Sequence, residues 1–455
     1  MKKGGIQSIP LAIACLLLGC SHYQPKPLTD EVIQKELETP TVQQLTIQAA
    51  KIRHPLIKPI TFNLQDGLSP DEAALLAVLR NPELRASRDK QGIAKAQLLQ
   101  AGLLPNPTLS YNFAALNGGL DQGKVTGFGL GLAWEITSLI VQSNKITAAV
   151  AEQKAVDLQI AWQEWQIAQA AKTAVYKLIA NTKQQQLLEE MAQRLESNAI
   201  LMQQAADKGL VTELERVAAV NAKNSVDLRL QALLLQKNQQ QQRLNRALGL
   251  KPDETITLQS NLPLTEESTA PAYDKLTHDL TNRRLDLMAL QQAYKNQDEQ
   301  VHIAVLQQFP KISIGFTQTK NNSNYYTAGA GVSVTLPIFD QNQGQISLTE
   351  ATRQQLFDEY TNRVFQSNAD IAELLATITS LNQQILSVRT AIPELKNLVN
   401  TYKQAIDSGQ VDILTYTTAW NNCTDKQIEL IALQLQLDEA RIGLEIATGI
   451  YHLQA

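Results

Sequence analysis

The sequence predicts a mainly helical protein with a smaller β component, built from two internal repeats. Its long helices are expected to form a coiled-coil helical barrel, and each chain is expected to add four transmembrane β-strands to a trimeric, 12-stranded β-barrel. Three observations predict this fold. They are a repeat of about 200 residues, helical periodicity sustained far beyond a globular domain, and four segments with strict two-residue alternation.

Length and composition limit the possible domain organisation and partners. At 455 residues the chain exceeds a single ordinary core, so more than one structural unit is expected. The net charge of -4 contains no basic surplus, so nucleic acid is not expected as a partner. Aromatic residues make up only 5% of the chain, which favours long helices with polar faces over a compact globule.

The first residues predict export and a lipid anchor. Lys2 and Lys3 precede an apolar run over 9–18 that is too short to span a bilayer, so 1–19 is expected to be a lipoprotein signal peptide. The string Leu17-Leu18-Gly19-Cys20 resembles a bacterial lipobox, which implies that Cys20 is acylated and becomes the mature N-terminus. The alternative is an ordinary signal peptide with a chance cysteine.

A repeat organises the rest of the chain. The string at 205–211 reappears at 405–411, and the same shift of 200 residues carries Leu244, Ala247 and Gly249 onto Leu444, Ala447 and Gly449. Two copies of one structural unit are therefore expected. The predicted domains are an extended, lipid-anchored N-terminal tether over 20–68, repeat 1 over 69–250, a linker over 251–272 and repeat 2 over 273–455.

Each repeat is expected to hold a helix, a strand pair, a very long helix and a returning helix. The first helix opens with a capping box at Ser69-Pro70-Asp71-Glu72 and is predicted to run to about residue 101. The long helix is predicted over 138–208, because apolar residues recur there by threes and fours, and it would span roughly 105 Å. Its counterpart is predicted over 345–408. The returning helices are expected over 213–248 and up to about residue 448.

Four segments alternate between apolar residues and small or polar ones, which predicts transmembrane β-strands over 109–115, 128–136, 312–317 and 328–336. The small, polar face is expected to line a lumen. The alternative is two soluble hairpins packed on the helices. The strand residues expected to face lipid are Phe128, Leu130, Leu132, Trp134, Ile312, Ile314, Phe316, Val332 and Val334.

Four strands cannot close a barrel, and open sheet edges are not tolerated in lipid. Cyclic oligomerisation is therefore expected. Two chains would give a barrel of eight strands, whose interior is filled by side chains, whereas three chains leave a passage. A homotrimer is the smallest assembly expected to conduct.

Three strings carry a family resemblance. They are Asn81-Pro82-Glu83-Leu84-Arg85-Ala86, Ala101-Gly102-Leu103-Leu104-Pro105-Asn106-Pro107-Thr108-Leu109-Ser110 and Leu336-Pro337-Ile338-Phe339-Asp340-Gln341-Asn342-Gln343-Gly344. With them the sequence resembles the TolC-like outer-membrane efflux protein family, and the third string is most similar to its CzcC-type, heavy-metal branch. The resemblance implies a trimer in the outer membrane of a Gram-negative bacterium, lipid-anchored and extending into the periplasm. It also implies two partners, a periplasmic adaptor (membrane fusion) protein and an inner-membrane transporter of the RND type.

The resemblance further implies that the two turns after the long helices form a periplasmic tip that docks the adaptor. The tip residues are Gly209, Leu210, Val211, Thr212, Gly409, Gln410 and Val411. These residues also fit plain helix stops, and both interpretations can hold. Asp412 is the candidate for a pore constriction, an acidic ring that would favour cations. A solvated or capping aspartate is the alternative.

No catalytic chemistry is expected. The five histidines lack metal-ligand spacing with cysteines or carboxylates, so neither a metal site nor a cofactor is predicted. The expected function is a passive export duct from periplasm to exterior, the outer-membrane channel of a tripartite efflux system for metal ions or small toxic compounds. The alternative is a lipid-anchored coiled-coil scaffold or adhesin without a pore.

Overall fold

The computed structural model describes residues 23–450, apart from 37–41, 51, 53, 59, 61–66, 116, 119–122, 260–262, 268–270 and 409. Cys20 and Gly409 therefore lie outside the described residues. The chain divides into two compact units, Met1–Leu45 and Thr46–Ala455. The first contains α2 (Asp30–Glu36) and the start of α3 (Val42–Ala50).

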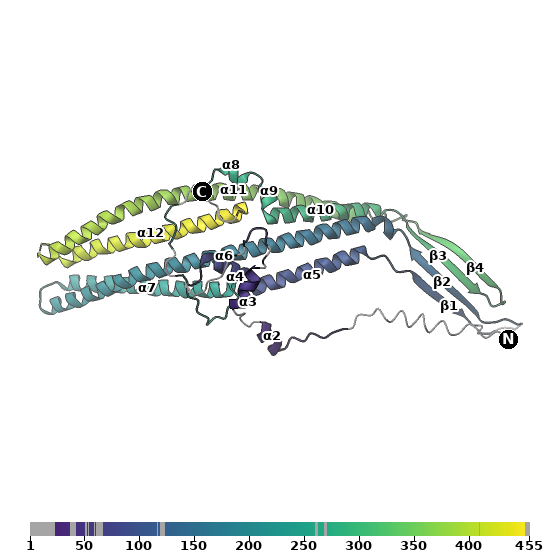
Figure 1. Ribbon diagram of the computed structural model, residues 1–455, viewed down its shortest axis with the longest axis horizontal. Coiled ribbons are helices and arrows are strands. Elements are labelled where there is room, and N and C mark those ends of the chain that lie inside the picture. The colour runs from purple at the N-terminus through teal and green to yellow at the C-terminus, as the bar shows by residue number, and fades with distance from the viewer. Residues whose placement is uncertain are drawn as a thin grey trace. The chain divides into compact units, whose positions relative to one another are not determined.

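The second unit contains the long helices and the strands, in the same order in both halves (Figure 1). Its first half comprises α4 (Pro70–Arg80), α5 (Pro82–Gly102), β1 (Thr108–Ala114), β2 (Gly127–Glu135), α6 (Ser138–Asp207) and α7 (Glu213–Ala247). Its second half comprises α8 (Tyr273–Thr277), α9 (Leu280–Arg283), α10 (Leu285–Leu306), β3 (Lys311–Lys320), β4 (Tyr326–Thr335), α11 (Gln343–Asp407) and α12 (Ile413–Thr448).

The two long helices are confirmed. α6 has 70 residues and α11 has 65, and each is followed by a shorter returning helix, α7 with 35 residues and α12 with 36. Each hairpin has an apolar core of its own. In the second, Ile371, Ile378 and Ile385 recur every seven residues along α11 and pack against Leu437 and Leu444 of α12. That spacing is typical of a coiled-coil seam.

The prediction of one helix from residue 69 to about 101 was wrong, because the helix is interrupted at Asn81. Asn81 has φ -55° and ψ 122° and is at once the C-cap of α4 and the N-cap of α5. Its side chain accepts hydrogen bonds from the backbone N–H groups of Glu83 (2.9 Å) and Leu84 (3.2 Å). The physical reason is Pro82, since proline disfavours the helical conformation in the residue before it.

The segment 20–68 was expected to be extended throughout, but it contains α2 and α3, and its end is packed. Ala49 and Ile57 are buried in a core cluster with Trp162 and Trp165 of α6. The backbone of Leu68 pairs with the 251–272 linker, because its N–H donates to Thr257 O at 2.9 Å. The end of the predicted tether is therefore part of the helical body.

A buried histidine fixes this packed end. The Nε2 of His54 donates to Ala161 O at 2.8 Å, and its Nδ1 accepts from the backbone N–H groups of Leu56 (3.0 Å) and Ile57 (2.9 Å). The Nδ1 must be unprotonated to accept them. Burial lowers the pKa of His54 below its usual 6.5.

We expect His54 to make stability depend on pH. The folded state keeps His54 neutral, so the unfolded state binds more protons, and the free energy of unfolding falls as the pH drops below about 6.5. Tm measured by circular dichroism at about pH 7.5 and about pH 5.5 checks this. The drop should shrink in His54→Gln, and an unchanged drop would contradict the assignment.

Two equivalent glycines lie at the ends of the repeats, against the last residues of α4 and α9. Gly249 (φ +63°) and Gly449 (φ +66°) follow α7 and α12. A Cβ added to Gly249 would lie 2.7 Å from Arg80 O, and one added to Gly449 would lie 3.1 Å from Arg283 O. Both positions therefore combine a left-handed backbone with a close approach between chain segments.

Gly249→Ala should lower the free energy of unfolding by about 1–3 kcal/mol, because it adds both strain and a clash. Gly92→Ala is the matched control. Gly92 lies inside α5 with nothing within 4 Å of its added Cβ, and the change should stabilise by about 0.5–1 kcal/mol. Thermal unfolding of the detergent-solubilised proteins compares the two, and equal Tm values would count against this account.

Candidate functional site

The four strands form one antiparallel sheet in the order β1-β2-β3-β4. The register pairs Leu132 with Leu109 on one side and with Phe316 on the other, and it pairs Val334 with Ile312. Directly paired residues share a face of the sheet. All nine strand residues singled out in the sequence therefore lie on one face, together with Leu109, Tyr111, Phe113, Ala328 and Ala330.

This apolar face is uncovered by the rest of the chain. Phe316 is 61% exposed and Val332 is 69% exposed, where a protein core would leave such side chains almost fully buried. The soluble alternative required the hairpins to fold onto the helices. The exposure of the apolar face removes the packing on which that alternative depended.

The opposite face is lined by small and polar residues. Gly131 pairs with Ser110 and Thr317, and Gly129 pairs with Asn112 and Thr319. A Cβ added at Gly331 would meet nothing within 4 Å, so the space above this part of the face is open. A face of this composition leaves room beside it and is readily hydrated.

The sheet has two open edges, β1 and β4. Open edges present unpaired backbone N–H and C=O groups. Within the described part of the chain, no helix is long and apolar enough to cross a membrane.

The first interhelical turn ends α6 as a Schellman motif. Gly209 has φ +70°, its N–H donates to Ala206 O at 2.9 Å, and the N–H of Leu210 donates to Ala205 O at 2.9 Å. Thr212 then starts α7 through a capping box with Glu215. The turn holds Leu210 out in solvent, 74% exposed.

The second turn repeats one hydrogen bond of the first. Gln410 N–H donates to Ala405 O at 2.9 Å, which matches the bond of Leu210. Asp412 is the N-cap of α12, and its carboxylate accepts from Thr415 N at 2.8 Å and from Thr415 Oγ1 at 2.9 Å. The hydrogen bonds from Thr415 lower the pKa of Asp412. The capping role left open in the sequence is therefore present, and Asp412 is exposed and charged.

Near these turns, polar side chains join the α6–α7 hairpin to the α11–α12 hairpin. The Arg194 guanidinium of α6 lies 4.7 Å from the ring centroid of Trp420 and donates to Tyr416 Oη at 3.3 Å. Arg229 of α7 donates to Asp425 Oδ1 at 2.9 Å. Sequence reasoning missed these pairs, since a single arginine inside a helical pattern predicts no partner about 200 residues away.

The comparisons with known proteins come from sequence and from structure. Residues 276–450 match the family model described as "Outer membrane efflux protein". Over 184 residues the chain is 23% identical to the probable outer membrane lipoprotein SilC of Salmonella typhimurium. That alignment covers 38% of this chain and 40% of SilC, so the chain matches about two fifths of the length of that curated relative.

Solved structures of channels share the fold. CusC matches with a TM-score of 0.67 at 17% identity over 88% of this chain and 98% of that chain. The CmeC outer membrane channel of Campylobacter jejuni matches with a TM-score of 0.71 at 18% identity over 84% of this chain and 86% of that chain. Residues 276–450 therefore resemble the outer membrane efflux proteins, and the chain shares the fold of the solved outer-membrane channels.

Substitutions at Asp412 distinguish the effect of its charge from its role as the N-cap of α12. Asp412→Asn should keep the stability of α12 within a few tenths of a kcal/mol, because asparagine caps helices as well as aspartate does. Asp412→Ala should cost about 1 kcal/mol and increase hydrogen exchange over 413–418. Equal exchange in both variants would mean that the cap contributes nothing here.

Proposed function

We propose that this chain is the outer-membrane channel of a tripartite efflux system, a passive duct from periplasm to exterior. The observation that carries the proposal is the sheet. One face is apolar and uncovered, the other is small and polar, and both edges are open. In lipid such a sheet is stable only when its edges pair with further strands. Three copies of this four-stranded sheet would supply a barrel of 12 strands with room for a passage.

The helices support the same assembly. The outermost helices of the two hairpins, α7 and α11, carry exposed apolar residues that the single chain leaves without partners. On α7, Leu228 and Leu235 are exposed and seven residues apart, and on α11, Phe365 and Leu386 are exposed. A heptad spacing suits packing against a neighbouring helix. A homotrimer would bring the α7 edge of one copy to the α11 edge of the next.

The partners follow from the same proposal. The turns at Gly209 and Asp412 would form the periplasmic tip, where an adaptor protein docks and an inner-membrane transporter of the RND type supplies the energy. Cys20, if acylated, would anchor the chain to outer-membrane lipid. The string at 336–344 supports metal ions or small toxic compounds as cargo, because it resembles the heavy-metal branch of the family.

Detergent-extracted protein should migrate as a trimer and should produce single-channel conductance in planar bilayers. Heat-modifiable migration on gels, together with bilayer recording, measures both properties. A monomer without conductance would favour the alternative, a lipid-anchored coiled-coil scaffold or adhesin.

The tip is tested by Gly209→Val. A β-branched residue cannot easily adopt φ +70°, so the turn should distort and efflux should be lost while the trimer persists. Gly209→Asn is the matched control, because asparagine tolerates this conformation, and it should retain most of the efflux. Efflux is measured as resistance of cells that carry the adaptor and the transporter. Loss of the trimer in Gly209→Val would instead give this turn a role in assembly.

A further inference from the structure

One row of side chains crosses all four strands at one end of the apolar face. It consists of Phe113, Phe128, Lys320 and Tyr326, each paired directly with the next, and we call it the aromatic row. β1 and β3 end beside this row and β2 and β4 begin there, whereas the helices join the strands at the opposite end (Figure 1). Under the proposed function, the end of the sheet that carries the aromatic row faces the exterior.

Lys320 is the charged residue of the apolar face. The four strands contain two further charged residues, Glu135 and Lys311, and both lie on the small, polar face at the end near the helices. A cation on the lipid side of a barrel is costly at the bilayer midplane and costs little near the bilayer surface. Lys320 therefore stands at the end of the strand where lipid tolerates a cation.

The length of the strand agrees with this position. From Ile312 to Lys320, β3 rises roughly 27 Å at about 3.4 Å per residue. Strands of outer-membrane barrels tilt by about 40°, which reduces this rise to roughly 20 Å across an apolar band about 25 Å tall. The aromatic row therefore lies just inside the outer boundary of the band, and a lysine side chain is long enough to reach that boundary.

The ammonium group of Lys320 lies over an aromatic ring. Its Nζ is 5.6 Å from the centroid of the Tyr326 ring, and that ring packs edge-on against Phe128 with the centroids 6.4 Å apart. A cation over a ring face still has N–H donors for a further partner. Within the part of the chain that the structure describes, no carboxylate forms an ion pair with Lys320.

The turn beside the aromatic row is held by its own hydrogen bonds. Asn321 Oδ1 accepts from the backbone N–H groups of Ser323 and Tyr325, each at 3.0 Å. The described residues of the β1–β2 and β3–β4 connections include one charged residue, Lys124. Asp121, in the first connection, lies outside the described residues. The described surface at this end of the sheet is therefore positively charged.

From this arrangement we propose that the aromatic row binds the phosphate-bearing headgroup of a lipid in the outer leaflet of the outer membrane. The inference rests on the proposed function, which sets this end of the sheet at the outer surface. The rings would contact the upper part of the acyl chains, and Lys320 would donate a charge-assisted hydrogen bond to a phosphate oxygen. Positive charge favours an anionic lipid over a zwitterionic one. A closed trimer would repeat this site in each copy.

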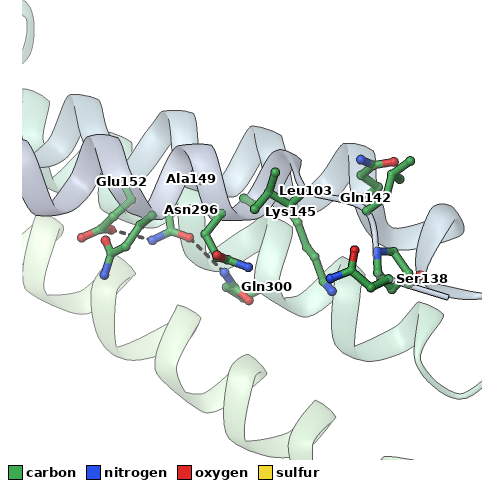
Figure 2. Close-up of a pocket in the computed structure, with 14 residues that line it drawn as sticks. Leu103, Ser138, Gln142, Lys145, Ala149, Glu152, Asn296 and Gln300 are labelled. Carbon is green, nitrogen blue, oxygen red and sulfur yellow. Dashed lines mark hydrogen bonds between the residues drawn. The ribbon is translucent and has the colours of Figure 1, made fainter. Parts of the chain in front are cut away.

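A lysine beside a cavity on the helices gives a contrast. Figure 2 shows Lys145 and Gln142 toward one end of a groove on α6 and Glu152 at the other. The described residues that line this groove include no aromatic side chain, and the Glu152 carboxylate accepts from Asn296 Nδ2 at 2.6 Å. Such a lining has no aromatic surface for acyl chains and adds a negative charge. Lys320, and not Lys145, has the surroundings that a lipid phosphate requires.

Native mass spectrometry of the purified oligomer tests the site. The protein is incubated in nonionic detergent with lipid A, a glycolipid that carries phosphate groups, and the retained lipid is counted. Lys320→Gln should retain about five-fold less lipid A than the parent, the factor that one lysine contributes near an anionic surface. Lys320→Arg should retain as much as the parent. Lys311→Gln is the matched control, because it removes a lysine from the opposite face of the same strand, and it should also retain as much.

Two results would overturn the site. One is equal retention of lipid A by Lys320→Gln and the parent. The other is equal retention, by the parent, of lipid A and its dephosphorylated form, because apolar contact alone would then hold the lipid. Single-channel conductance of the same preparations separates this inference from the proposed function. Conducting oligomers that give either result leave the duct standing, whereas a parent that neither trimerises nor conducts removes the proposed function and this site with it.

Discussion

The four-stranded sheet has two unpaired edges and an exposed apolar face, and the rest of the structure depends on how these are covered. Each chain builds four antiparallel strands whose register places every large apolar side chain on one face, and it leaves β1 and β4 without neighbours. Water would penalise the uncovered apolar face, and lipid would penalise the open edges. Under the proposed function, pairing between copies relieves both penalties at once. The proposed oligomer is then a condition for the sheet and not an addition to it.

Away from the sheet, the two long helical hairpins are stabilised by different interactions within each hairpin and between them. Each long hairpin has its own apolar core, whereas polar and charged pairs join α6 to α12. Lys172 lies 3.3 Å from Asp71 and 3.4 Å from Glu445, and Lys177 lies 2.8 Å from Glu439. The buried charge of Lys172 is tolerated because it is paired with these two carboxylates. Apolar packing thus stabilises each hairpin, and the two hairpins are joined by hydrogen bonds, ion pairs and the apolar contacts of Trp420 and Ile428 with the first hairpin.

The elements that could be predicted from the sequence are those with a local periodicity of apolar residues. Two-residue alternation identified the strands and their apolar face. The three-and-four spacing of apolar residues identified α6, and the internal repeat identified α11, both to within a few residues. The break at Asn81 was also readable, since a proline follows it, but the sequence analysis continued the helix through this position. The faces could be assigned because a strand or helix fixes them locally.

Contacts between distant segments could not be predicted. Nothing in the local sequence of His54 indicates that its ring will reach the backbone of Ala161, and nothing near Arg194 indicates Trp420. The burial of Ile57 was missed for the same reason, because a polar, proline-containing segment predicts an extended chain until its partner is known. The two interhelical turns were predicted at the right places in the chain, yet the two hydrogen bonds that Asp412 accepts from Thr415 needed coordinates.

The most direct measurement is cross-linking between sheet edges. Cysteine is placed at Ser110 on β1 and, in turn, at Gly329, Gly331 or Ser333 on β4, all on the small, polar face. Edges that pair between copies should give covalent dimers and trimers of outer-membrane protein at one of these registers. Chains that remain single at every register, with the edges accessible to soluble thiol reagents, would contradict a barrel shared among copies.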